Sequence, residues 1–302
     1  MAEYIISYGK PYPLGATVNR DGSVNISFAA RGNGVTGINL YKKNNRKAPV
    51  AHIELDSSYR IGGIYCVHIE GIDIDNTEYT LLDGEEHCDI YSRQIRGNES
   101  WGEVSEDILH SGFVRNDDEY SGAEKLEYSN SIIYLVHVRG FTKHMSGKVK
   151  NPGTFEGIVE KIPYLKDLGV TTLELMPAYE FSEARKKAEK TNIIRHGEKD
   201  IDLKKDIALN YWGYGEGYYF APKASFAADP ENAAKSFGDM VKALHKEGME
   251  VVMQFNFPDT IKPGFILEVL KYWVLTYGVD GFHLMGERIP LTLIATEPLL
   301  LD

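Results

Sequence analysis

Apolar and polar positions alternate over short distances in the first part of the chain. Short apolar runs are separated by turn signals such as Arg20-Asp21-Gly22-Ser23 and Asp83-Gly84. Five of these runs are predicted to be strands: Ser23–Ala30, Gly37–Tyr41, Val50–Leu55, Ile64–Ile69 and Thr77–Leu82. Because turns separate the runs and no amphipathic helix intervenes, residues 1–115 are predicted to form an antiparallel, immunoglobulin-like β-sandwich.

The pattern changes at Ser131, where strand-like apolar runs begin to alternate with helical periods. Four strands are predicted: Ile132–Val138, Val170–Met176, Met249–Phe257 and Val279–Met285. Helices are expected after Thr154, after Asp229-Pro230 and over Phe265–Tyr277, where capping residues precede an apolar stripe. Such alternation gives parallel strands with right-handed crossovers, so residues 130–302 are predicted to be the first half of a (β/α)8 barrel.

Two polar stretches interrupt this pattern. Residues 116–129 are acidic and are expected to be a linker between the two domains. The long connection Pro177–Asp229 is dense in Lys, Glu and Arg in its middle. We expect a solvated excursion there, and a substrate lid is the alternative.

The formal net charge of the 302-residue chain is −11, which disfavours a nucleic acid or an anionic membrane as partner. No apolar run approaches the roughly 20 residues of a membrane span, and the first residues do not resemble a signal peptide. Cys66 and Cys88 cannot staple a chain of this length, so a cytoplasmic location is expected. The 19 tyrosines suit a carbohydrate ligand, although most tyrosines serve packing.

Motifs for other chemistries are missing from the sequence. The two cysteines lack the spacing of a zinc site, and neither a Gly-x-Gly-x-x-Gly fingerprint nor a Walker loop is present. The Gly-x-Ser-x-Gly elbow of hydrolases is also absent. We therefore expect no cofactor and no metal.

Several strings in the second region resemble one enzyme family. They are Ile132-Ile133-Tyr134-Leu135-Val136-His137-Val138-Arg139-Gly140-Phe141-Thr142, Glu174-Leu175-Met176-Pro177, Asn210-Tyr211-Trp212-Gly213-Tyr214 and Val279-Asp280-Gly281-Phe282. Their order and spacing resemble the α-amylase superfamily of glycoside hydrolases, in its pullulanase, isoamylase and glycogen-debranching branch. Pro13-Leu14-Gly15-Ala16-Thr17 is similar to the opening of the glucan-binding-module-like sandwich that precedes the barrel in that branch.

The resemblance implies a catalytic pair that this chain lacks. Retaining cleavage of a glucosidic bond needs two carboxyl groups about 5–5.5 Å apart. The family's nucleophile position is occupied by Met285 and its arginine position by His283. On the third strand, Gln254 replaces an aspartate and Asp259 replaces a sugar-binding histidine. With these positions degenerate, no intact catalytic residue is expected, although Asp259 could form an unorthodox pair with Glu287.

The resemblance also suggests where a sugar would bind. Tyr214 matches a tyrosine that stacks against sugar in the family, and Trp212 belongs to the same string. His137 on the first barrel strand and Trp101 in the sandwich are further substrate-binding candidates. Packing is the alternative for each. Glu297 lies too close to Met285 in sequence to follow a further strand and helix, so we expect it at the surface rather than as the general acid.

These observations predict a protein that recognises an α-glucan or maltooligosaccharide without glycosidase activity. Two alternatives remain: an active glycoside hydrolase whose carboxylates come from elsewhere, and a structural or regulatory subunit of a glucan-processing enzyme. Four parallel strands leave two open edges. We therefore expect either a piece of a longer protein, with the C-terminal half of the barrel missing, or a half-barrel that forms a homodimer.

Overall fold

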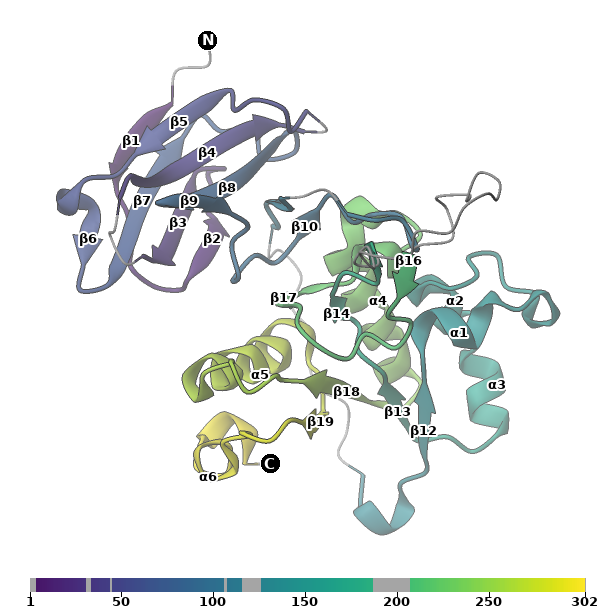
Figure 1. Ribbon diagram of the computed structural model, residues 1–302. Helices are drawn as coiled ribbons and strands as arrows, with labels where there is room; N and C mark the ends of the chain where they lie inside the picture. The colour runs from purple at the N-terminus through teal and green to yellow at the C-terminus, as the bar shows by residue number, and fades with distance from the viewer. Residues whose placement is uncertain are drawn as a thin grey trace, which may run out of the picture.

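The computed structural model describes residues 4–30, 34–43, 45–105, 108–115, 126–186 and 207–301 (Figure 1). An antiparallel N-terminal region is followed by a parallel β/α region, as predicted. Strand β10 (Ile95–Arg96) lies between these two regions in Figure 1.

The N-terminal region consists of two antiparallel sheets, and each of the five predicted strands is present. The first sheet has the order β1 (Ile5–Tyr8), β7 (Ile64–Glu70), β3 (Val24–Ala29), β2 (Gly15–Val18), with β6 (Arg60–Ile61) paired to β7. The second has the order β10, β11 (His110–Ser111), β8 (Thr77–Asp83), β4 (Thr36–Lys42), β5 (Ala51–Glu54), with β9 (Glu85–His87) paired to β8. The prediction missed the short strands β1, β2, β6, β9, β10 and β11.

Strand β3 shows why the sandwich forms. Its residues Val24, Ile26 and Phe28 alternate along the strand and are buried in the core between the sheets. The polar residues between them are buried too, because the segment before β2 covers the other face. Ser27 Oγ donates a 2.7 Å hydrogen bond to the Pro11 carbonyl there.

The β/α region contains a four-stranded parallel sheet whose strands lie in chain order. They are β12 (Ile133–Val136), β13 (Thr172–Leu175), β18 (Glu250–Asn256) and β19 (Gly281–Met285). The helices are α1 (Val138–Lys143), α2 (Phe155–Val159), α3 (Ile162–Asp167), α4 (Ala233–Lys246), α5 (Pro263–Tyr277) and α6 (Leu291–Ile294). The predicted partial barrel is therefore confirmed, with β12 and β19 as the edges of the sheet.

One predicted boundary is wrong. The first barrel strand ends at Val136 instead of Val138, because His137 caps helix α1 and Val138 already belongs to that helix. The His137 imidazole accepts from the Gly140 amide, which would otherwise have no partner in the first turn of the helix. Residue 137 therefore caps the helix and does not extend the strand.

Helices α4 and α5 bury an aromatic core against the sheet. Trp273 on α5 is fully buried, and its ring lies 4.9 Å from Phe237 of α4 in an edge-on arrangement. Its indole Nε1 donates a 2.7 Å hydrogen bond to the Tyr219 carbonyl. Among the described residues, no helix is long and apolar enough to cross a membrane.

The described ends of the long connection form two small antiparallel sheets. Strand β14 (Tyr179–Glu180) pairs with β17 (Tyr218–Pro222), and β15 (Ala184–Lys186) pairs with β16 (Ile207–Leu209). The connection is thus more ordered at both ends than we expected. Its middle and most of the predicted linker 116–129 lie outside the described residues.

A buried ion cluster ties the segment after the sandwich to the barrel. Lys223 Nζ lies 3.0 Å from Glu180 Oε1 and 2.8 Å from Glu183 Oε2, and all three side chains are fully buried. Asn98 Nδ2 donates to Glu180 Oε1, and the Gly102 amide donates to Glu183 Oε1. Residues that precede the predicted linker therefore complete the polar interior of the barrel region.

Candidate functional site

Four polar residues meet on one face of the parallel sheet, and we call them the polar cluster: Glu174, Tyr214, Gln254 and His283. Gln254 on β18 is the direct neighbour of His283 on β19. Glu174 on β13 pairs with Val252, two residues before Gln254, so all three strand residues face the same side of the sheet. Tyr214 reaches them from the segment between β16 and β17.

Hydrogen bonds connect the polar cluster through the Glu174 carboxylate. Its Oε1 accepts from Gln254 Nε2 at 2.6 Å and lies 2.7 Å from His283 Nδ1. Because a carboxylate only accepts, the proton in the second contact belongs on His283 Nδ1. Tyr214 donates its hydroxyl to Gln254 Oε1 at 2.9 Å. Partial burial, and then the nearby Glu174 charge, raise the pKa of Tyr214, so its hydroxyl stays a neutral donor.

The polar cluster contains one carboxylate. Retaining glycoside cleavage needs two, one as nucleophile and one as acid. Glu174 already accepts from a histidine and a glutamine. The cluster can therefore orient hydroxyl groups of a ligand, but it does not contain a nucleophile and acid pair.

The four degenerate positions of the sequence analysis are spread over this end of the sheet. Gln254 is buried within the cluster, whereas the His283 side chain is 53% exposed beside it. Met285 ends β19, and its carbonyl accepts from the Phe257 amide at 2.9 Å. Asp259 is exposed in the turn after β18. No observation tests the roles assigned to these positions, so the loss of catalysis stays a prediction.

Two aromatic side chains beside the cluster are open to solvent. Trp212 is 50% exposed and Tyr214 is 37% exposed. A tight turn holds them, because Asn210 Oδ1 accepts from the Gly213 amide and Asn210 Nδ2 donates to the Tyr214 carbonyl. Gly213 has φ of 79°, and a Cβ there would lie 2.4 Å from the Phe181 ring. The turn therefore requires glycine, and it presents both rings at the surface.

The His137 side chain holds this turn in place through contacts with Tyr211. Its Nδ1 accepts from the Gly140 amide, so the proton lies on Nε2, which is 2.8 Å from the Tyr211 carbonyl. The imidazole stacks on the Tyr211 ring at 4.5 Å, and burial lowers its pKa. Both ring nitrogens are engaged, so in this arrangement His137 positions the aromatic turn. Direct contact of His137 with a sugar stays a prediction.

Trp101 does not lie in the sandwich, where we expected it. It stacks on Phe226 of the barrel region at 5.4 Å, and its ring lies edge-on to Tyr211. The Arg139 guanidinium carbon lies 5.0 Å from the Trp101 ring centroid. Trp101 therefore packs against aromatic residues of the barrel region, which agrees with the packing alternative.

Glu174 was not predicted as a site residue. In the sequence it stands within a string that resembles the family, and a signal for its role was present. A charged residue stands in the otherwise apolar run Leu173-Glu174-Leu175. A charge at such a position needs a polar partner. Glu297 lies outside the cluster and pairs with Lys271 of α5 at 3.6 Å. Among the described residues, no group of three or more His, Cys, Asp or Glu could hold a metal ion.

Comparison with known proteins relates this chain to one enzyme family. The chain is 28% identical to chloroplastic isoamylase 1 of Arabidopsis thaliana over 93% of its own length. It is 29% identical to pullulanase A of Streptococcus pneumoniae over 57% of its length. No family profile matches the chain. The chain is therefore similar to pullulanases and isoamylases of the α-amylase family.

Solved pullulanase structures share the fold of this chain. The catalytic module of the pneumococcal glycogen-degrading protein SpuA superposes with a TM-score of 0.67 over 92% of the chain, at 21% identity. A pullulanase from Paenibacillus barengoltzii in complex with maltohexaose and α-cyclodextrin superposes with the same TM-score of 0.67, at 17% identity. The chain spans less than half of these proteins, 44% of isoamylase 1 and 47% of the SpuA module.

Proposed function

We propose that this chain recognises α-glucans of the glycogen and starch type and does not cleave them by itself. The observation that carries the proposal is the polar cluster, whose exposed Tyr214 ring lies in the same turn as the exposed Trp212 ring; the resemblance adds that Met285 stands where the family has its nucleophile. A sugar ring can stack its apolar face on Trp212 or Tyr214 while its hydroxyls pair with polar groups nearby.

The chemistry of the polar cluster supports binding over hydrolysis. The imidazole of His283 is half-exposed to solvent. Two hydrogen bonds, from Gln254 and His283, fix the orientation of the Glu174 carboxylate. A thioether at Met285 cannot attack an anomeric carbon as a carboxylate does. A solved relative was crystallised with maltotetraose, which makes maltooligosaccharides the first ligands to test.

Binding is tested by calorimetric titration of the chain with maltoheptaose. We expect Tyr214→Ala to weaken binding about two- to tenfold, because it removes an aromatic contact and a hydrogen bond to Gln254. Tyr128→Ala is the matched control, since Tyr128 is 91% exposed and precedes the first barrel strand. Absence of binding, or equal losses in both variants, would contradict glucan recognition at this site and favour a structural or regulatory role.

Catalysis is tested by release of reducing ends from glycogen, pullulan and amylopectin. We expect no turnover by the chain alone. Turnover that Glu174→Gln abolishes would assign catalysis to the polar cluster and overturn the proposal. The double variant Met285→Asp with His283→Arg should restore little activity, because Gln254 on the third strand and Asp259 just after it still differ from the family pattern. Sedimentation velocity of the same sample distinguishes a homodimer from a single half-barrel.

A further inference from the structure

A cavity lined by none of the polar-cluster residues lies between the sandwich and the start of helix α4. Its volume is about 490 Å³, and β10, the segment after β11, the first turn of α4 and the end of α5 contribute to its wall. This volume falls in the range of sites that bind small molecules. No role has been assigned to it above.

The wall of the cavity is positively charged although the chain is acidic. Four basic side chains line it, Lys43, Arg96, Arg115 and Lys235, against two acidic ones, Asp75 and Glu231. The whole chain has a net charge of −11. A local excess of positive charge in such a protein concentrates anions at this point of the surface.

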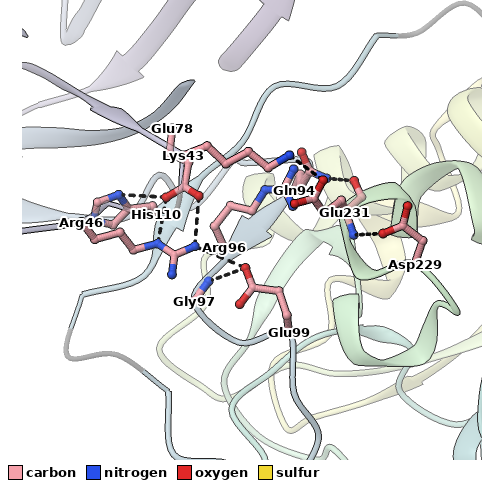
Figure 2. A network of polar contacts seen from close by, with 10 residues as sticks. All are labelled: Lys43, Arg46, Glu78, Gln94, Arg96, Gly97, Glu99, His110, Asp229 and Glu231. Atoms are coloured by element: carbon pink, nitrogen blue, oxygen red, sulfur yellow. Dashed lines mark hydrogen bonds and ion pairs between the residues drawn. The ribbon is translucent and has the colours of Figure 1, made fainter. Parts of the chain in front are cut away.

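Arg96 has unused hydrogen-bonding capacity. Its side chain is only 10% exposed, and its nearest carboxylate oxygen, Glu231 Oε1, is 4.0 Å away. Among the residues that the structure describes, no partner accepts a hydrogen bond from Arg96 Nε. Figure 2 shows that neighbouring groups are satisfied: Arg46 pairs with Glu78 and Glu99, while Gln94 and Lys43 bind Glu231. A buried guanidinium with an unpaired Nε carries a free-energy cost, and the exposed part of the Arg96 side chain lines the cavity, where it can meet an anion.

Helix α4 adds a second source of positive potential. It begins at Ala233, and the side chain of its N-cap residue Asn232 makes no capping hydrogen bond. The cavity wall includes Asn232, Ala234 and Lys235 from this helix start. The 3-10 turn Pro230–Asn232 leads directly into α4 and is capped by Asp229 at the Glu231 amide, so this helix start contributes the positive end of its dipole rather than uncapped amides.

We propose that this cavity binds a phosphoryl group, either as free phosphate or as the phosphate ester of a small molecule. Arg96 and the first turn of α4 hold the anion, and Lys235 and Lys43 add charge at the rim. A planar guanidinium fork matches phosphate oxygens in geometry as well as charge. Because the wall comes from both regions, the bound anion also fastens the sandwich to the barrel.

The test measures binding and thermal stability with inorganic phosphate and with glucose 6-phosphate. Glucose and sodium chloride at equal ionic strength are the controls. We expect both phosphates to raise the melting temperature and to give binding heat, and glucose and chloride to do neither. Tighter binding of glucose 6-phosphate identifies an ester as the ligand, and equal or tighter binding of phosphate identifies the free anion. No specific response to either phosphate would overturn the proposal.

Two variants locate the site. Arg96→Gln should weaken phosphate binding at least about tenfold, because a charge-assisted hydrogen bond is lost. Lys235→Gln, at the exposed rim, should weaken it about two- to fivefold, and it keeps the test decisive if the Arg96 variant does not fold. The control Arg288→Gln removes the same charge from an exposed position outside the cavity and should leave binding unchanged. Unchanged binding in the Lys235 variant, or equal losses in all three, would refute the assignment.

Discussion

The buried lysine at the centre of the barrel's ion cluster allows a quantitative prediction. In the variant Lys223→Met, a side chain of similar length fills the space without the charge. Glu180 and Glu183 then lose their counterion in an interior where both are fully buried. Removing one partner of a buried ion pair typically costs about 3–5 kcal/mol.

The remaining hydrogen bonds place the expected loss at the lower end of that range. Glu180 keeps Asn98 Nδ2 and the Ala224 amide as donors, and Glu183 keeps the Gly102 amide. We therefore expect a loss of about 3 kcal/mol. For a chain of 302 residues that unfolds in one step, this corresponds to a fall in melting temperature of about 5 °C.

The loss of stability in the Lys223→Met variant should depend on pH, and the direction of that dependence can be predicted. Burial raises the pKa of Glu180, and the Lys223 charge lowers it in part, so in the variant this pKa rises further. A carboxyl whose pKa is higher in the folded than in the unfolded state makes stability fall as pH rises between the two values. Because protonation of Glu180 removes the need for a counterion, the deficit should be larger at pH 8 than at pH 5.

Urea unfolding and calorimetry at the two pH values check this prediction. Lys235→Met is the matched control, because its pair with Asp239 is exposed and spaced i,i+4. It should cost less than about 0.5 kcal/mol at either pH. Adding Glu180→Gln to Lys223→Met should recover part of the loss. A deficit below about 1 kcal/mol, or one that is equal at pH 5 and pH 8, would refute the reasoning.

Three further changes test packing and capping. Trp273→Ala should cost about 3–5 kcal/mol in urea unfolding, because it empties a fully buried site and frees the Tyr219 carbonyl; a cost below about 2 kcal/mol would show that the core collapses around the change. Thr154→Ala should cost about 1 kcal/mol, because its hydroxyl caps helix α2 through the Gly157 amide, and Thr154→Ser should restore most of it. Gly157→Ala should lower the melting temperature, because a Cβ would lie 2.4 Å from the Asn151 carbonyl oxygen; an unchanged melting temperature would mean that this backbone contact yields easily.

The sequence predicted what depends on local periodicity. The strands around Ile26 and Val67 follow from the alternation of apolar residues, and the parallel strands follow from their alternation with capped helices. The short strands β10 and β11 could not be predicted, because two residues are too few to show a periodic pattern of apolar positions. The end of the first barrel strand at Val136 depends on a single imidazole acceptor from His137, which no pattern of hydrophobicity reveals.

The site was predicted less completely than the fold, since long-range partners determine it. The resemblance identified Tyr214, Gln254 and His283, which the structure brings together. It did not identify Glu174 as the residue that joins them, because the contact spans 109 positions in the case of His283. Lys223 was also missed for this reason, since a lysine in sequence gives no indication that it is fully buried.

The buried ion cluster has a consequence for how the chain can be divided. A cut within the predicted linker, residues 116–129, separates the antiparallel strands of the sandwich from the parallel strands of the barrel region. It leaves Asn98, Trp101 and Gly102 on the sandwich fragment. These residues donate to Glu180 and Glu183 or pack on Phe226. A barrel fragment that begins at residue 130 would thus expose an aromatic surface and lose donors from its interior. Asn98, Trp101 and Gly102 belong to the barrel by their contacts, although Glu99 between them pairs with Arg46 of the sandwich, so the unit of folding and the unit of sequence do not coincide.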